Sequence, residues 1–278
     1  MKKLRYYLAI VLIVIAMVCY LIPFNSCNNG KPPDEDTTHA NLPPVPIFQT
    51  NIFGSPHPHD TLSFTEGFLF YKGFIYESTG LKGKSKLLKI NPTTWKIEKQ
   101  IDLDSNYFGE GISIVHDSIY QMTYQEHRVF VYDLDLNKKR EFYFDTDTHE
   151  GWGMTTDGTN LIVSDGSSSI QYFEPSTFKL LKRINVTESG VPVPNVNELE
   201  LIDGFIYANQ WQFNPSYIFK IDPATGQVVG KTDITNIWNL TIQNDSDAGP
   251  NGIAYDSTTK KIYITGKKWP KLYEVKFQ

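Results

Sequence analysis

Residues 66–98 have the sequence EGFLFYKGFIYESTGLKGKSKLLKINPTTWKIE, and this stretch indicates the fold class. It contains four short segments rich in aromatic, β-branched and aliphatic residues, separated by residues that favour turns. Lys72 and Gly73 separate the first two segments, and an Asn-Pro-Thr-Thr phrase at 91–94 separates the last two. Glycine accepts the positive φ angle that tight hairpin turns require. The stretch therefore predicts a unit of four antiparallel strands.

The same unit recurs along the chain. A short phrase that usually has glycine at its centre occurs five times, and its central residues are Gly67, Gly111, Gly153, Glu198 and Gly252. The intervals between them are 44, 42, 45 and 54 residues, close to the length of one four-stranded propeller blade. We therefore predict an all-β fold, a five-bladed β-propeller.

The fifth repeat lacks a fourth strand at its C-terminal side. Its third strand is expected at residues 271–275, and the chain ends three residues later. The segment from Val45 to Ile52 precedes the first blade and is strand-like. We expect this N-terminal strand to complete the last blade, because closing the ring covers the edges that an open sheet would leave exposed.

The N-terminal sequence has the form of an export signal. Three basic residues within the first five precede an apolar run over residues 6–23, and a small residue precedes Cys27. The expected parts of the chain are a signal peptide with a lipidated cysteine, Cys27, at 1–27, a flexible tether at 28–44, and the propeller, as catalytic domain, at 45–278. An uncleaved signal anchor is the alternative, since the apolar run is near the lower length limit for a spanning helix. Either form places the propeller in the periplasm or cell envelope, attached to a membrane.

Composition excludes several classes of function. The net charge is -5 and no block of Lys or Arg occurs in the body of the chain, so nucleic acid is not an expected partner. The two cysteines, Cys19 and Cys27, both lie in the leader, which excludes a disulfide, a cysteine nucleophile or a thiolate zinc site in the body. None of the six histidines has the spacing of a ligand set, so we predict no metal.

In a propeller, equivalent loops of every blade meet around the axis, so repeat-equivalent positions become neighbours. Loop positions of this kind and the ends of the second strands hold carboxylates, amides, a lysine and aromatic rings. These candidate residues are Phe64, Glu66, Phe108, Glu110, Tyr124, Trp152, Asn197, Trp211, Asn251 and Lys267. Such a set predicts a pocket for a small polar group flanked by stacking surfaces.

Several phrases resemble the plant and bacterial glutaminyl cyclases, over essentially residues 60–278. They are Phe-Thr-Glu-Gly at 64–67, Tyr-Glu-Ser-Thr-Gly at 76–80, Phe-Gly-Glu-Gly at 108–111, Gly-Trp-Gly at 151–153, Asn-Glu-Leu-Glu at 197–200, Ala-Asn-Gln-Trp at 208–211 and Thr-Gly-Lys-Lys-Trp-Pro-Lys-Leu at 265–272. The resemblance implies an enzyme without a cofactor that converts N-terminal glutamine of peptides or proteins to pyroglutamate and releases ammonia.

The resemblance also implies roles for single residues. The family's catalytic glutamate falls on Glu110, its pocket asparagine on Asn197 and its pocket lysine on Lys267. Its aromatic wall falls on Phe64, Phe108, Trp152 and Trp211. The chain departs from the family at Glu66, where glutamine is common, and at Tyr124, where tryptophan is usual. The first departure adds negative charge beside Glu110 and is expected to raise a carboxyl pKa.

Each candidate residue also has a structural alternative. Glu66 and Glu110 could cap loop amides, Lys267 could be a solvated surface residue, and the tryptophans could pack between blades. Two alternative functions stay open as well: a non-catalytic propeller that binds peptide N-termini, and a propeller hydrolase or lyase acting on sugars or lactones. The latter usually needs a metal ring of carboxylates and histidines, which the sequence does not show.

Overall fold

A computed structural model describes residues 43–211, 214–241 and 245–277 of the chain. The predicted signal peptide, the lipidated Cys27 and nearly all of the predicted tether lie outside the described residues. Within the described ranges, no helix has the length and apolar character that a membrane span needs.

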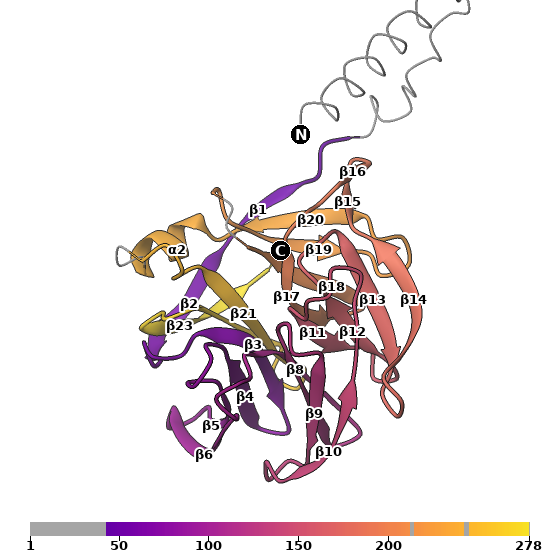
Figure 1. The fold of residues 1–278 in the computed structure, drawn as a ribbon. Coiled ribbons are helices and arrows are strands. Elements are labelled where there is room, and N and C mark those ends of the chain that lie inside the picture. The colour runs from indigo at the N-terminus through magenta and orange to yellow at the C-terminus, as the bar shows by residue number, and fades with distance from the viewer. Residues whose placement is uncertain (1–42, 212–213, 242–244, 278) are drawn as a thin grey trace, which may run out of the picture. The chain divides into compact units, whose positions relative to one another are not determined.

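The described residues form five sheets of four or five strands, one for each repeat, and one small two-stranded sheet (Figure 1). Blade 1 contains β3 (Thr65–Tyr71), β4 (Phe74–Thr79), β5 (Lys86–Asn91) and β6 (Lys96–Asp102). Blade 2 contains β7 (Gly109–Val115), β8 (Ser118–Thr123), β9 (Arg128–Tyr132) and β10 (Lys138–Tyr143). Blade 3 contains β11 (Met154–Thr156), β12 (Leu161–Ser164), β13 (Ser169–Glu174) and β14 (Lys179–Asn185). A short hairpin of β15 (Thr187–Glu188) and β16 (Val191–Pro192) follows.

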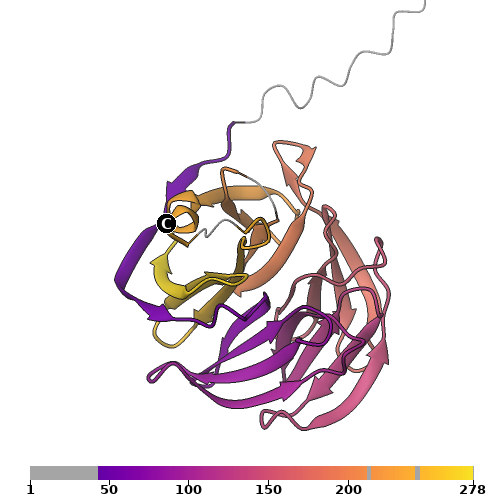
Figure 2. The same cartoon turned by 60° about the vertical axis from the view of Figure 1, so that its left-hand side comes forward.

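The last two blades include strands from the N-terminal segment. Blade 4 contains β17 (Val196–Ile202), β18 (Phe205–Gln210), β19 (Tyr217–Ile221), β20 (Val228–Asp233) and, at its edge, β1 (Ile47–Gln49). Blade 5 contains β21 (Pro250–Asp256), β22 (Lys261–Gly266), β23 (Lys271–Lys276) and β2 (Asn51–Pro58). The first strands β3, β7, β11, β17 and β21 contact one another in this order, and β21 contacts β3. The ring is therefore closed, with the last blade beside the first (Figure 2), and the predicted five-bladed propeller is confirmed.

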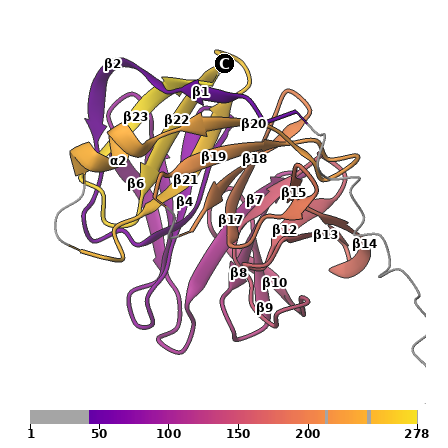
Figure 3. The same ribbon diagram turned by 90° about the horizontal axis from the view of Figure 1, so that it is seen from above.

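An N-terminal strand completes the last blade, but the predicted bounds of that strand were wrong. β2 pairs antiparallel with β23, with Ile52 opposite Val275, whereas the preceding β1 pairs parallel with β20 of blade 4 (Figure 3). The observed strand β2 extends beyond the predicted end at Ile52, through Gly54 and two prolines, Pro56 and Pro58. An edge strand tolerates such residues, since one side of it makes no ladder hydrogen bonds.

The long interval between the fourth and fifth repeats contains a helix that the sequence analysis did not predict. α2 (Thr235–Thr241) follows β20 directly and precedes the loop to β21. The carboxylate of Asp233 accepts a hydrogen bond of 2.8 Å from the backbone N–H of Thr235 at the start of the helix. The additional residues of this repeat are therefore an insertion between blades 4 and 5.

Backbone contact between neighbouring blades explains the glycine at the centre of the repeated phrase. A Cβ atom at Gly67 would lie 2.6 Å from the backbone nitrogen of Ile112, in the next blade. Glu198 takes this position in blade 4, and its carboxylate accepts hydrogen bonds from the backbone N–H groups of Phe68 (3.3 Å) and Ile253 (2.9 Å). This side chain therefore joins blade 4 to blades 1 and 5.

Apolar side chains fill the spaces between adjacent blades. Five clusters of buried residues each join one pair of neighbours, as Ile162 of blade 3 and Leu199 of blade 4 do in the largest. Burial of such side chains is the main stabilising contribution in a body that lacks disulfides.

Candidate active site

Irregular pairing in the innermost strands places four of the candidate side chains. The pairing register shifts in β3, β7, β17 and β21, in each case near the strand's first residues. An additional residue at a bulge lets the backbone turn a side chain away from the regular alternation. The candidate residues at these shifts are Glu66, Glu110, Asn197 and Asn251.

Three further candidates occupy one equivalent position in their blades. Tyr124, Trp211 and Lys267 each follow directly the last residue of a second strand, β8, β18 and β22 respectively. The second strand runs antiparallel to the first, so its end lies beside the start of the first strand. These side chains therefore lie at the same end of the propeller as those at the bulges.

One small cavity of about 150 Å³ brings these residues together. Nine of the ten candidate residues line it, namely Phe64, Glu66, Phe108, Glu110, Tyr124, Trp152, Asn197, Trp211 and Lys267. Pockets for larger ligands have volumes of about 300–1,000 Å³, so this cavity suits a single amino-acid side chain. Segments from all five blades thus contribute to one site.

Asn251 differs from the sequence prediction, which gave it contact with the substrate. It is fully buried and does not line the cavity. Its side-chain N–H group donates hydrogen bonds to the carboxylate of Glu66 (2.9 Å) and to the backbone oxygen of Thr65 (3.0 Å). We therefore assign Asn251 to holding Glu66 in place. Asn251 and Asn197 both lie at register shifts of innermost strands, so the repeat pattern alone did not separate the two roles.

Lys267 and Glu66 form a buried ion pair, with 2.6 Å between Nζ and Oε1. Their side chains are 6% and 2% exposed, which excludes a solvated surface lysine. The Nζ atom also lies 4.1 Å from the ring centroid of Trp211 and 4.5 Å from that of Phe64. Ammonium groups are attracted to aromatic faces, more strongly where water is excluded. The lysine is therefore held at the cavity wall by a carboxylate and two rings.

The Glu110 carboxyl lies beside Glu66 and is also buried. Burial raises the pKa of Glu110 well above its usual value, and the negative charge of Glu66 raises it further. The two carboxyl groups are hydrogen-bonded to each other. Because Lys267 and Asn251 both donate to Glu66, the charge is stabilised on Glu66 and the proton on Glu110. Among the residues that the structure describes, no backbone N–H donates a hydrogen bond to either carboxylate, so neither caps a loop amide there.

Asn197 presents an amide with unused hydrogen-bonding capacity. It is 2% exposed, and its side-chain oxygen has no hydrogen-bond partner among the residues that the structure describes. Buried polar atoms are nearly always paired in folded proteins. This oxygen is enclosed by the protein and is therefore an exception among buried polar atoms, while Asn197 as a residue lines the cavity.

Glu150 is a residue of the site that the sequence analysis missed. Its carboxylate accepts hydrogen bonds from the Trp152 indole N–H (3.0 Å) and the Gln125 side chain (2.8 Å). Burial raises the pKa of Tyr124, and the nearby Glu150 carboxylate raises it further, so one acid fixes the Trp152 indole and lies close to Tyr124. The only signal in the sequence was an acidic residue two positions before Trp152, and nothing in the sequence linked it to Tyr124.

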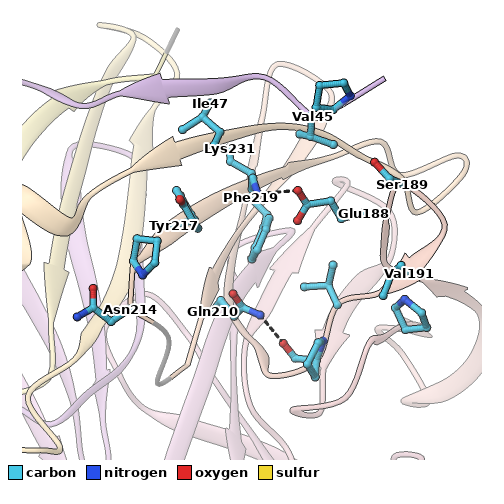
Figure 4. A pocket seen from close by; sticks show the side chains of 15 residues that line it. Val45, Ile47, Glu188, Ser189, Val191, Gln210, Asn214, Tyr217, Phe219 and Lys231 are labelled. Atoms are coloured by element: carbon cyan, nitrogen blue, oxygen red, sulfur yellow. Dashed lines mark hydrogen bonds and ion pairs between the residues drawn. The ribbon is translucent and has the colours of Figure 1, made fainter. Parts of the chain in front are cut away.

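A larger cavity, of about 590 Å³, lies beside β1, β19 and the β15–β16 hairpin and contains none of the candidate residues (Figure 4). Its charged groups are paired with each other, since Lys231 Nζ lies 2.5 Å from Glu188 Oε1. The Gln210 side chain donates to the backbone oxygen of Pro194 at 3.0 Å. The groups that could do chemistry are therefore in the smaller cavity. No cluster of three or more metal-binding side chains occurs within residues 43–211, 214–241 and 245–277.

Residues 31–277 match the glutamine cyclotransferase family. The chain belongs to this family. A relative from Arabidopsis thaliana, glutaminyl-peptide cyclotransferase, is 32% identical over 282 residues, which cover 100% of this chain and 84% of the relative. The crystal structure of Myxococcus xanthus glutaminyl cyclase is similar with a TM-score of 0.76 and 33% identity, over 84% of this chain and 98% of that one. The family membership thus extends over the whole propeller and includes every blade that contributes to the cavity.

Proposed function

We propose that the chain is a glutaminyl-peptide cyclotransferase, which converts N-terminal glutamine of peptides or proteins to pyroglutamate with release of ammonia. The observation that supports it best is the buried set of Glu110, Glu66 and Lys267 in a cavity the size of one amino-acid side chain. The family's activity favours an enzyme over a propeller that only binds peptide N-termini.

The reaction needs no nucleophile from the protein. The α-amine of the substrate attacks its own γ-amide carbon, a carbon–nitrogen bond forms, and the bond to the amide nitrogen breaks. Glu110 carries a proton in the free site and acts after losing it: ionised Glu110 takes the proton from the amine and returns it to the departing nitrogen, which leaves as ammonia. An α-amine has a pKa of about 8, so a carboxyl whose pKa is raised by burial is better matched to this transfer than an ordinary one.

The remaining groups bind and orient the substrate. Lys267 donates to the amide oxygen, on which negative charge develops during the attack. Asn197, which lines the same cavity, assists by donating its side-chain N–H to that amide oxygen. Trp152 and Trp211 hold the side chain folded against its own amine, which supplies proximity.

Incubation of residues 43–278 with a glutamine-initiated peptide tests the function directly. Mass spectrometry should show loss of ammonia from that peptide and no change in a matched peptide that begins with glutamate. Activity should be the same with and without a chelator. An unchanged mass for the glutamine peptide would leave only a binding function.

Replacing Glu66 by glutamine should move the acid limb of the pH profile of kcat to lower pH. The substitution removes a negative charge that raises the pKa of Glu110, although the larger effect of burial remains. Lys267, freed from its partner, then also favours ionised Glu110. The kcat profile reports groups in the enzyme–substrate complex. A shift toward higher pH would show that Glu66 does not act on the proton-transferring group.

Replacing Glu150 by alanine should raise KM by about fivefold and change kcat less. The loss corresponds to about 1 kcal/mol, the usual contribution of a hydrogen bond, because the Trp152 indole loses its acceptor. Steady-state kinetics measures both constants. The control is Glu141→Ala, an exposed acid on β10 that is paired with Lys138. An equal effect of the two substitutions would argue against a positioning role for Glu150.

We also propose that the chain is exported and attached to a membrane by a lipid on Cys27. The proposal rests on the basic residues and apolar run before Cys27. In a bacterial host, Cys27→Ser should move the protein from the membrane fraction to the soluble fraction or block its processing. An unsubstituted chain that keeps its full length in the membrane, with the same size and location as Cys27→Ser, would indicate the uncleaved anchor instead. The net charge of -5 supports peptides, rather than nucleic acid, as partners.

A further inference from the structure

A second cavity, of about 360 Å³, adjoins the reaction cavity and shares Trp211 with it. We call it the Trp238 cavity; its lining includes Trp211, Trp238, Gly249, Pro250, Gln210 and Ser246. The indole of Trp211 thus lies between the two cavities. On the side of the reaction cavity, Lys267 Nζ lies 4.1 Å from its ring centroid.

The inserted segment between blades 4 and 5 builds this cavity. Trp238 lies on α2, and its indole N–H donates a hydrogen bond of 3.2 Å to the backbone oxygen of Ala248. At Gly249, which follows Ala248, a Cβ atom would lie 2.9 Å from Cζ3 of Trp211, so the absence of a side chain leaves room for that ring. Both indoles are therefore fixed by the additional residues of the fourth repeat.

We infer that the Trp238 cavity binds the side chain of the residue that follows the N-terminal glutamine, and that it favours an aromatic or large apolar side chain there. The inference rests on the proposed function. Consecutive Cα atoms are about 3.8 Å apart, so a residue joined to a glutamine in the reaction cavity lies within reach of the neighbouring cavity. Two indoles and a proline offer stacking and apolar contact, while polar groups such as Gln210 and Ser246 lie among them.

The test compares peptides that differ only in the second residue. For Gln-Phe and Gln-Gly peptides of equal length, kcat/KM should differ by about tenfold in favour of phenylalanine, equivalent to about 1.4 kcal/mol. In Trp238→Ala this ratio should fall close to one, and Trp238→Phe should restore most of it. The ratio is insensitive to loss of folded enzyme, since such a loss lowers both rates equally.

Two further variants make the result specific. Ser246→Trp adds bulk at an exposed position of the same cavity and should also lower the ratio. Trp95→Ala removes an indole that stacks on His57, with 4.0 Å between ring centroids, and should leave the ratio unchanged. Equal rates for the two peptides in the unsubstituted enzyme, or an unchanged ratio in Trp238→Ala, would overturn the inference. If both peptides are cyclised at equal rates, the inference about the second residue fails and the proposed function stands. If neither peptide is cyclised, the proposed function fails.

Discussion

Replacing Glu110 by glutamine is expected to lower kcat by about 10²- to 10⁴-fold, the usual contribution of a general acid or base. KM should change little, because the amide retains the shape of the carboxyl and can still donate a hydrogen bond to Glu66. Protonated Glu110 makes the same bond, so the fold should be preserved. Steady-state kinetics on a glutamine-initiated peptide and the thermal unfolding midpoint measure the two effects separately.

The matched control is Glu198→Gln. Glu198 is another buried acid of an inner strand, and burial raises its pKa as well, but it bonds to backbone groups of neighbouring blades and does not line the cavity. Its substitution should lower stability while kcat stays close to that of the unsubstituted enzyme. Full cyclase activity in Glu110→Gln would refute the proton-transfer role.

The repeat phrase was sufficient to predict the ring. Its period counted the blades, and the hairpin turn that the sequence predicted at Lys72 and Gly73 has the positive φ angles of 46° and 82° that such a turn needs. Repeat equivalence also identified nine residues that line one cavity. This was possible because a propeller brings equivalent positions of distant segments to one end of its axis.

The features that the sequence did not reveal depend on contacts without a periodic signal. Edge pairing of β1 with β20 involves backbone groups that any residue can supply, so the pattern did not divide residues 45–58 between two blades. The acceptor role of Glu150 depends on a loop that folds back on Tyr124. The function of Asn251 depends on the fact that Glu66, to which it is hydrogen-bonded, reaches the cavity and Asn251 does not. Each is decided by packing in three dimensions rather than by residue type.

Replacing Lys267 by methionine is expected to lower both stability and activity. The substitution leaves the buried Glu66 without its cation, and breaking a buried ion pair in this way costs about 3–5 kcal/mol. For a domain of this size the loss corresponds to a fall of about 6–20 °C in the unfolding midpoint. Loss of the donor to the amide oxygen should reduce kcat by about 10²- to 10³-fold.

The destabilisation should grow with pH. In the folded enzyme Lys267 lowers the pKa of Glu66, while burial, the largest effect, raises it. Without the lysine the folded-state pKa rises further above the value in the unfolded chain. A carboxyl group whose pKa is higher in the folded than in the unfolded state lowers the free energy of unfolding as pH rises. This loss begins near the pKa of the unfolded state and is complete above the pKa of the folded state. Lys267→Met should therefore unfold more easily at pH 8 than at pH 5, relative to the unsubstituted enzyme at each pH.

Adding Glu66→Gln to Lys267→Met separates the two functions of the lysine. The double variant has no buried charge to compensate, so it should recover much of the lost stability and lose the additional pH dependence. Its kcat should stay about 10²- to 10³-fold lower, because the donor to the amide oxygen is still absent. Recovery of kcat together with stability would show that Lys267 only balances the charge of Glu66. A Lys267→Met variant as stable as the unsubstituted enzyme at pH 8 would show that the ion pair contributes little to the fold.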